Sequence, residues 1–321
     1  MIFEAGAARV ARVLQIEEGA SDAKTSLEPQ LKPKLILHVG LPKTGTTSIQ
    51  ECLYINRDRL AGMGLRFADR LGREKGFGHH KLGRLLATSG PGAFIDQLGR
   101  QDAIVSAENL SYIFLRDTEG KLAALADVYD LHVIVFVRRA DYLLESAFAQ
   151  MVKMGMKLNI ERFRHAILEP AAIVNSITNV IGDERVSCVL YTDPGFDSWA
   201  AFCAAAGFPE LPRAEKRANV SMHRRKTLLL SKVAIKKREL AIKLSEHVAA
   251  CDTVEDDGIR FLASLDKRRS VIRDHELANR DLCERFGLDA DYMMAEPDDD
   301  WHKPKPITPQ EWVDTLWLSR D

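Results

Sequence analysis

The first two thirds of the chain alternate between short, nearly continuous apolar runs and longer stretches with helical spacing. The apolar runs are residues 35–39 (LILHV), 103–107 (AIVSA), 132–137 (HVIVFV) and 185–191 (RVSCVLY). A strand that is buried on both faces gives such a run, whereas a strand with one solvated face alternates apolar and polar residues. These runs predict an α/β fold, in which helices cover both faces of a central parallel sheet.

Apolar residues recur at helical intervals between the predicted strands. A helix is predicted over residues 46–60, where Ile49, Leu53 and Leu60 share one face. Further helices are predicted over residues 121–129, 141–154, 160–165 and 171–181, and another after Trp199 that ends near Gly207. Parallel strands need such crossover connections, so the helices and the strands predict the same architecture.

The two ends of the chain differ from this central part. Residues 1–33 hold a weakly amphipathic stretch and then a polar run with prolines, which predicts a short helix and a linker. Residues 34–225 are the predicted α/β core, and residues 226–321 are predicted to form a helical region that packs on it. Within that region, the acidic residues 289–300 predict a loop and residues 307–321 an amphipathic closing helix.

Residues 213–243 are strongly basic, with eleven Lys and Arg against two Asp and Glu. Apolar positions interleave with the charges, as on an amphipathic helix. Two interpretations stay open: a solvated helix face, which is the more common structure, or an electropositive lip over an anionic ligand.

Composition narrows the classes of function. The 45 Lys and Arg residues balance 46 Asp and Glu residues, for a formal net charge of −1, so no basic excess favours nucleic acid or an anionic membrane as partner. No apolar run reaches the length of about 18 residues that spans a membrane, and the first residues lack the apolar stretch of a secretory signal. We therefore expect a cytoplasmic protein without a transmembrane segment. The sequence leaves its oligomeric state open.

The five cysteines are far apart and form no CxxC pair. A structural zinc site needs closely spaced ligands, so none is expected. Scattered single cysteines fit a reducing compartment.

The most informative segment is residues 38–50 (HVGLPKTGTTSIQ), where a strand passes through a glycine-bearing loop directly into a helix. The first N–H groups of a helix have no partner within it, and the helix dipole adds positive charge at the same point. Together they make an anion site. Gly45 allows the backbone to approach an anion closely, and Thr46, Thr47 and Ser48 offer hydroxyl groups.

The loop differs from the nucleotide-triphosphate pattern GxxxxGK[ST] at one decisive position. Gly40 and Gly45 have the required spacing, but Thr46 stands where that pattern has its lysine. The loop's lysine is Lys43, two residues before Gly45. An ATP-dependent phosphotransferase would therefore lack the lysine that reaches the β- and γ-phosphates, although it remains an alternative.

PKTGTT resembles the 5′-phosphosulfate loop of sulfotransferases that use 3′-phosphoadenylyl sulfate (PAPS). The resemblance implies a P-loop-like three-layer fold, and it implies that the loop backbone and hydroxyls hold the 5′-phosphate of the donor. Lys43 would then reach the bridging oxygen of the leaving group. The implied donor-binding residues of the loop are Pro42, Lys43, Thr44, Gly45, Thr46, Thr47 and Ser48.

A second segment resembles the same family's 3′-phosphate motif. Arg138 ends an apolar strand, and Ser146 lies eight residues later inside the next predicted helix. A guanidinium donates two hydrogen bonds to a phosphate, and a hydroxyl adds a third contact. Arg139 is the competing arginine, but Ser146 fixes the register on Arg138, and a surface salt bridge is the favoured role for Arg139.

Weaker similarities concern two further segments and the longer run that begins at Arg138. Tyr191 in VLYTDP resembles a tyrosine near the adenine, although a core tyrosine explains it equally well. The segment 217–226 resembles the late basic loop near the 3′-phosphate, so Arg217, Asn219 and Ser221 are possible ligands. It lacks the glycine-rich pattern of cytosolic small-molecule sulfotransferases. The run RRADYLLESAFAQMVKMG is closer to bacterial carbohydrate-type members, which implies a carbohydrate hydroxyl as acceptor.

The resemblance implies that PAPS donates a sulfuryl group in line to the acceptor, that PAP is the product, and that no metal is needed. Glu108 follows the second predicted strand at the position where the family has its catalytic base. His79 and His80, in a predicted glycine-flanked loop, are rivals for that role. A non-catalytic nucleotide-binding protein of the same fold is the second alternative.

Overall fold

The computed structural model describes residues 31–41, 43–68, 77–164, 169–192, 195–214, 222–298 and 302–317. The chain divides into two compact units, Met1–Lys32 and Pro33–Asp321. The fold below is that of the second unit. A helix and a linker are expected over residues 1–33. Residues 1–30 of that segment lie outside the described part of the chain.

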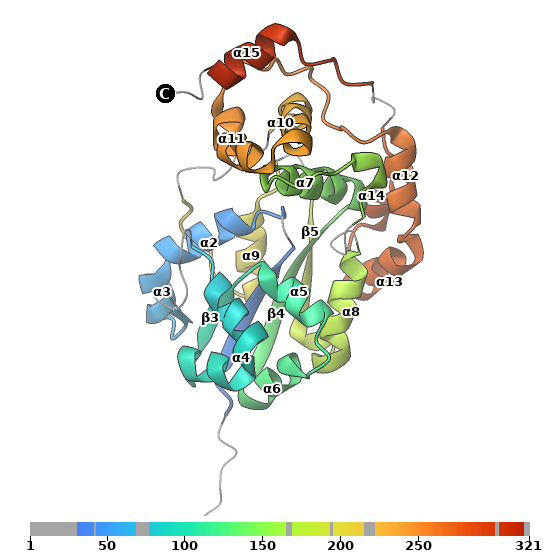
Figure 1. The fold of residues 1–321 in the computed structure, drawn as a ribbon. Coiled ribbons are helices and arrows are strands. Elements are labelled where there is room, and N and C mark those ends of the chain that lie inside the picture. Colours follow the sequence, from blue (N-terminus) through green and yellow to red (C-terminus); the bar gives the residue numbers. More distant parts are fainter. Residues whose placement is uncertain are drawn as a thin grey trace, which may run out of the picture. The chain divides into compact units, whose positions relative to one another are not determined.

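A parallel sheet lies at the centre of this unit, with the strand order β2-β3-β1-β4-β5 (Figure 1). Its strands are β1 (Lys34–Gly40), β2 (Arg66–Phe67), β3 (Ala103–Ser106), β4 (Asp130–Arg138) and β5 (Val186–Tyr191). Every adjacent pair is parallel. All four predicted strands are confirmed. The edge strand β2 was not predicted, because two residues are too few to give a periodic pattern.

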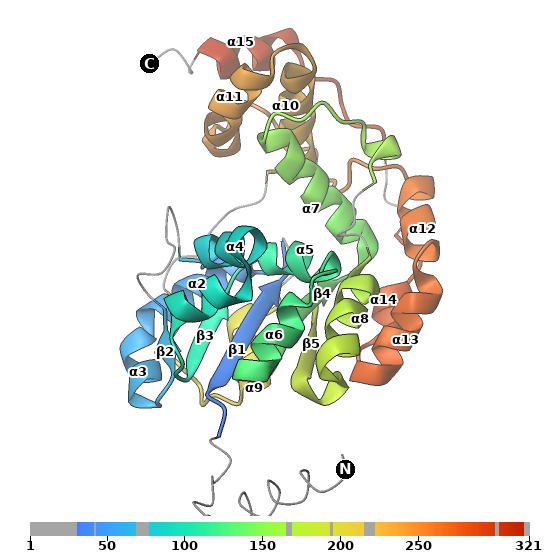
Figure 2. The same ribbon diagram turned by 60° about the horizontal axis from the view of Figure 1, so that its bottom comes forward.

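Helices cover both faces of the sheet and make three layers, as predicted (Figures 1 and 2). One layer contains α4 (His80–Leu98), α5 (Asn109–Leu115), α6 (Lys121–Val128) and α8 (Pro170–Ile181). The other contains α2 (Thr46–Ile55), α3 (Arg57–Gly62) and α9 (Ser198–Ala206). Successive β1 side chains point to opposite faces of the sheet. Leu35 and Leu37 pack in the hydrophobic core on the side of α4, and Ile36 packs in the core on the side of α2.

Several predicted helices differ in extent. The helix predicted over residues 46–60 is broken at Asn56, whose buried amide donates to the Cys52 carbonyl at 2.8 Å and so ends α2. The segment predicted over residues 160–165 is only a 3₁₀ turn, Ile160–Arg162. Helix α4 was not predicted, because Gly90, with φ of 82°, and Pro91 interrupt its pattern with a kink.

The remaining helices lie beyond the sheet (Figure 1). Helix α7 (Ala140–Lys153) follows β4 directly and packs against α10 (Arg224–Lys236), α11 (Arg238–Ala250) and α12 (Leu265–Arg273). Helix α13 (Glu276–Phe286) packs against α8, and α15 (Pro309–Trp317) is the amphipathic helix predicted near the C-terminus. The loop predicted over residues 289–300 is wrong in part, because it contains α14 (Ala290–Met294), which the Asp289 side chain caps at the Tyr292 N–H.

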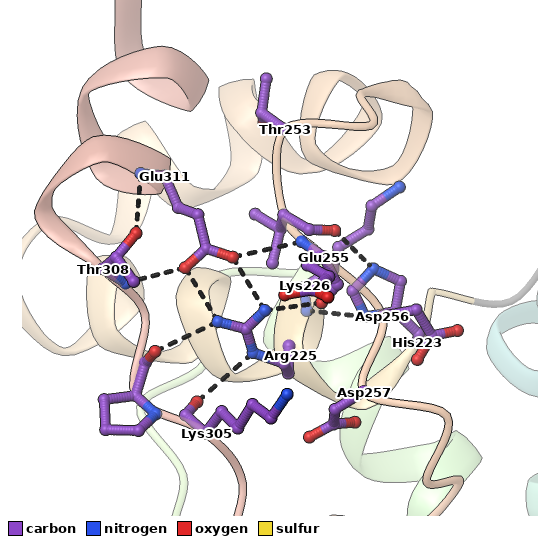
Figure 3. A network of polar contacts seen from close by, with 12 residues as sticks. His223, Arg225, Lys226, Thr253, Glu255, Asp256, Asp257, Lys305, Thr308 and Glu311 are labelled. Carbon is purple, nitrogen blue, oxygen red and sulfur yellow. Dashed lines mark hydrogen bonds and ion pairs between the residues drawn. The ribbon is translucent and has the colours of Figure 1, made fainter.

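Three cations of the basic segment, at the start of α10, lie inside the protein, and two of them appear in Figure 3. Arg225 forms a two-pronged ion pair with Glu311 at 2.8 Å and 2.8 Å, and Arg224 pairs with Asp257 at 2.7 Å. Lys226 donates to a backbone carbonyl of α11 at 3.1 Å. All three cations are buried, so this part of the segment is neither a solvated face nor a lip over a ligand. Five later cations are exposed: Lys232, Lys236, Lys237, Arg238 and Lys243.

A carboxylate on α7 holds the C-terminal region to the core. Glu145 Oε1 accepts hydrogen bonds from the backbone N–H groups of Leu262 at 2.9 Å and Ala263 at 2.7 Å. Burial raises the pKa of Glu145 to about 7, although these bonds and Arg268 lower it. The folded protein therefore takes up a proton at Glu145 at a higher pH than the unfolded chain does.

We predict that Glu145→Gln makes unfolding less sensitive to pH. Since the folded pKa of Glu145 is raised, its contribution to stability is present below about pH 4.5 and is lost as pH rises through 7. Glutamine keeps the accepting oxygen but cannot ionise. Relative to the wild type, the variant gains on the order of 1–3 kcal/mol in unfolding free energy between pH 5 and pH 8. Denaturant unfolding at both pH values measures this gain.

Glu161→Gln is the matched control, since Glu161 also accepts from a backbone N–H of the same region, that of Ser264 at 2.8 Å. A difference between Glu145→Gln and the wild type that stays constant from pH 5 to pH 8 contradicts the prediction.

Candidate functional site

The predicted site residues follow strands that end at one edge of the sheet. The register pairs His38 with Ser106 across β1 and β3, and Gly40 with Phe136 across β1 and β4. The segments that follow these three strands therefore leave the sheet side by side. Strand order also reverses at β1, and ligands of open α/β sheets bind at such a point.

The loop between β1 and α2, which we call the Lys43 loop, depends on two glycines. A Cβ atom on Gly40 would lie 1.9 Å from the Thr46 side chain. Gly45 has a left-handed conformation, with φ of 79°, and a Cβ atom there would lie 2.7 Å from Ser198 Oγ and 3.3 Å from the Tyr191 ring. The loop backbone therefore runs close to α2, β5 and α9.

The start of α2 offers N–H groups to a ligand. Gly45 precedes the helix, and the first bond of the helical pattern runs from Ile49 N to the Gly45 carbonyl at 3.2 Å. The first N–H groups of a helix have no acceptor within the helix and point out of its end, which favours an anion there. The Thr44 hydroxyl is buried and donates to the Leu41 carbonyl at 2.6 Å, so it closes the turn. Pro42 lies outside the described residues.

Lys43 has a strained backbone. Its φ is 72°, and among the described residues no other non-glycine residue has a positive φ. Its carbonyl accepts a hydrogen bond from Arg138 Nη1 at 2.9 Å, which holds it in this conformation. Burial lowers the pKa of Lys43, the charge of Lys153 lowers it further, and the charge of Glu108 opposes both. The ammonium group therefore lies among charged groups in a partly desolvated place.

Arg138 joins the two sequence motifs. Besides the Lys43 carbonyl, its Nη1 contacts Ser146 Oγ on α7 at 3.4 Å. The guanidinium also lies 5.1 Å from the Tyr191 ring centre and 5.6 Å from that of Tyr142. Arg138 and Ser146, which are eight residues apart in the sequence, are therefore in contact, and both lie beside the Lys43 loop.

Arg139 forms an ion pair with Asp141, with N–O distances of 2.8 Å and 2.9 Å. The pair is buried rather than on the surface as expected, since the two side chains are only 6% and 0% exposed. Its partner Asp141 also contacts Arg268, which links α7 to α12. Arg139 is therefore part of the scaffold and leaves Arg138 as the arginine beside the loop.

Glu108 lies opposite Arg138, across the Lys43 loop. It follows β3 and precedes α5, and its Oε1 accepts a hydrogen bond from Thr46 Oγ1. Thr46 is 3% exposed, so its side chain is turned toward Glu108. Thr46, which stands where the triphosphate pattern has its lysine, therefore holds the Glu108 carboxylate in place.

The rival histidines lie where the predicted loop meets a helix. His79 is the last residue before α4, whereas His80 is the first residue of that helix and so is not in the loop. His79 is fully buried, its Nδ1 accepts from the Ser106 N–H at 2.9 Å, and its Nε2 lies 3.1 Å from the Ala68 carbonyl. Both ring nitrogens are therefore engaged with the backbone. This arrangement favours Glu108 over His79 as a proton acceptor.

Two residues near the Lys43 loop were not found from the sequence. Ser198 packs against Gly45, and Lys153 acts on Lys43 through its charge. Neither belongs to a motif, so no signal in the sequence pointed to them. Tyr191 lies between Gly45 and Arg138, and its role near adenine stays a prediction. The possible ligands Arg217, Asn219 and Ser221 lie outside the described residues.

Two features are absent from the described residues. These residues contain no cluster of three or more His, Cys, Asp or Glu side chains placed to hold a metal ion. Across the same ranges, no helix is long and apolar enough to cross a bilayer.

Comparison with known proteins gives little beyond this geometry. No protein-family model matches the chain, and no curated protein does. A crystal structure of a sulfotransferase from Alicyclobacillus acidocaldarius is similar over 66% of this chain and 94% of that chain, with 16% sequence identity and a TM-score of 0.37. That score is too low to carry an argument, so the function must be inferred from the residues of this chain.

We predict that Gly45→Ala destabilises the fold more than Gly64→Ala does. Both glycines have a positive φ, 79° and 82°, so alanine costs each about 1–2 kcal/mol. At Gly64 the new Cβ meets nothing within 4 Å, whereas at Gly45 it also meets Ser198. The clash adds about 1–3 kcal/mol. Denaturant unfolding of both variants measures the difference, and equal losses contradict the close packing of the loop.

Proposed function

We propose that this protein is a sulfotransferase, which transfers a sulfuryl group from PAPS to the hydroxyl of an acceptor. One observation carries the proposal: Arg138 Nη1 contacts both the Lys43 carbonyl and Ser146 Oγ. This contact puts an arginine–serine pair, suited to one phosphate, beside a helix start that is suited to another. PAPS has that pair of groups, a 3′-phosphate and a 5′-phosphosulfate. It is a substrate here, not a resident cofactor.

The Lys43 loop favours this donor over a triphosphate. Thr46 occupies the position of the triphosphate-binding lysine, and its hydroxyl is bonded to Glu108. The chain therefore has no lysine at the position from which the triphosphate pattern reaches the β- and γ-phosphates. The strained backbone of Lys43 is of the kind that is found at ligand sites, where surrounding structure holds it in place. The ATP-dependent phosphotransferase therefore remains only the second candidate.

The proposed roles divide the reaction among residues on two sides of the loop. Glu108 removes the proton from the acceptor hydroxyl as its oxygen attacks sulfur. The bond from sulfur to the bridging oxygen breaks, and its electron pair stays on the 5′-phosphate of PAP. Lys43 stabilises that oxygen, and its lowered pKa makes its ammonium group a better acid toward it. The loop N–H groups, Thr47 and Ser48 bind the 5′-phosphate.

The acceptor is proposed to be a carbohydrate hydroxyl. This part rests on the resemblance of residues 138–155 to bacterial carbohydrate-type sulfotransferases. Those residues form the end of β4 and the whole of α7, which is the helix beside the Lys43 loop. The fold itself does not specify an acceptor.

We predict that PAP stabilises the protein against heat more than Mg·ATP does at equal concentration. A ligand that binds the folded state raises the melting temperature according to its affinity.

Lys43→Ala should reduce PAP release from PAPS, measured with a panel of carbohydrate acceptors, on the order of 100-fold. It should weaken PAP binding only modestly. Lys34→Ala, an exposed lysine at the other end of β1, is the control.

Three outcomes contradict the proposal in different ways. A larger shift with Mg·ATP supports the phosphotransferase. A shift with PAP but no transfer to any acceptor of the panel supports a non-catalytic nucleotide-binding protein. Unchanged transfer in Lys43→Ala overturns the mechanism.

We predict that Arg138→Ala weakens binding of PAP about 10- to 100-fold and binding of 5′-AMP by a clearly smaller factor, which reflects the lost hydrogen bond to the Lys43 carbonyl. The two ligands share the 5′-phosphate and differ at the 3′ position, so 5′-AMP is a control for damage to the Lys43 loop. Isothermal titration calorimetry gives both affinities. Equal weakening of both ligands means that Arg138 does not bind the 3′-phosphate.

A further inference from the structure

His79 binds the end of the strand that leads to Glu108. It is fully buried and is the last residue before α4. Its N–H donates to the Ser106 carbonyl at 2.8 Å, and the Ser106 N–H donates to His79 Nδ1 at 2.9 Å. The two-residue strand β2 pairs only with the first half of β3, so His79 takes the place of a strand partner at the end of β3.

The imidazole of His79 makes this contact only in its neutral form. Nδ1 accepts the Ser106 N–H and so carries no proton, which puts the proton of the neutral ring on Nε2. Nε2 lies 3.1 Å from the Ala68 carbonyl, which accepts its hydrogen bond. The Phe67 ring lies against the imidazole, with 4.6 Å between the ring centres. The ring of His79 is therefore held in one orientation toward β3.

Ser106 is held from its other side by a second buried histidine. His38, on β1, is fully buried, and its Nδ1 lies 2.7 Å from Ser106 Oγ. Burial lowers the pKa of His38 to about 3, so this ring is neutral as well. The end of β3 is thus held by His38 on the β1 side and by His79 on the β2 side.

The residue after Glu108 is held by the same segment. Asn109 Nδ2 donates to the His80 carbonyl at 3.0 Å. A Cβ atom on Gly83, one turn into α4, would collide with the Asn109 side chain, so α4 packs closely on the start of α5. The carboxylate of Glu108 accepts from Thr46. The strand before Glu108, the residue after it and its own carboxylate therefore each have a fixed partner.

A proton acceptor depends on such support. It has to lie within hydrogen-bond distance of the proton that it removes, and a shift of about 1 Å can cost on the order of 100-fold in rate. The Glu108 side chain makes no capping bond to α5, so the helix that it precedes does not hold it. The backbone of β3 is then what sets the height of Glu108 at the edge of the sheet.

We propose that His79 is a positioning residue, which aligns Glu108 with the acceptor hydroxyl through the backbone of Ser106. This role rests on the proposed function, in which Glu108 removes the proton, and it requires no proton transfer by His79 itself. Without the imidazole contact the end of β3 shifts, and Glu108 shifts with it. The Lys43 loop and Arg138 follow β1 and β4 rather than β3, so donor binding does not depend on this contact.

The experiment compares His79→Leu with His79→Asn, whose side chains are nearly equal in size. The asparagine Oδ1 takes the place of Nδ1 and can accept the Ser106 N–H, whereas leucine cannot. PAP release from PAPS with the carbohydrate panel gives kcat, and calorimetry gives PAP affinity. We expect His79→Leu to lower kcat about 10- to 100-fold and to change PAP affinity less than about threefold. His79→Asn should keep kcat within about threefold of the wild type.

A second comparison separates positioning of Glu108 from general support of the fold. In a Glu108→Gln background, His79→Leu should lower kcat no more than about threefold, because the group through which His79 acts is already lost. His132→Leu is the matched control. It removes an imidazole that lies 2.9 Å from Ser187 Oγ near the start of β4, on the same sheet, and it should leave kcat and PAP affinity within about threefold of the wild type.

The outcomes distinguish this role from the proposed function. A wild-type protein that transfers nothing from PAPS to the panel overturns the proposed function, and the role of His79 with it. If the wild type transfers, equal kcat in the leucine and asparagine variants overturns the role of His79 alone. A full effect of His79→Leu in the Glu108→Gln background does the same. His79→Gln, whose amide oxygen lies beyond the Nδ1 position, replaces the leucine variant if that variant does not fold.

Discussion

The hydrogen bond from Arg138 to the Lys43 carbonyl is the contact on which the arrangement of the site depends. It joins the end of β4 to the loop after β1, 95 residues apart in the chain, at 2.9 Å. The same guanidinium nitrogen reaches Ser146, so one group sets the distance between the loop and α7. It also holds a lysine in a conformation that costs free energy on its own. The strain, the arginine and the helix start therefore form one unit, and a change in any of them affects the others.

The parallel sheet explains why these groups meet. Side chains that follow β1, β3 and β4 emerge at one edge, and β1 lies between the other two strands. Glu108 and Arg138 consequently lie on opposite sides of the Lys43 loop. Hence a carboxylate able to accept a proton and a guanidinium able to bind a phosphate are separated by the group that would stabilise the leaving oxygen.

The distribution of cations separates scaffold from site. Near the start of α10, Arg224 and Arg225 are buried and paired with carboxylates, and they tie the segments around Asp257 and Glu311 to the rest of the unit. In the Lys43 loop, burial and the charge of Lys153 lower the pKa of Lys43. Burial of a charge is tolerated where a partner compensates it.

The sequence by itself determined the fold class, four strands and the loop at the start of α2, because buried runs and a glycine-bearing loop are local patterns. It also singled out Glu108, Arg138 and Ser146, whose roles remain predictions. It did not identify β2, the break at Asn56 or α4, where a short element, a side-chain cap and a kink interrupt the local pattern. Only the tertiary structure decided that Thr46 is bonded to Glu108, that His79 is engaged with the backbone and that the charge of Lys153 acts on Lys43. These facts depend on contacts between residues far apart in the chain, and such contacts leave no periodic trace along it.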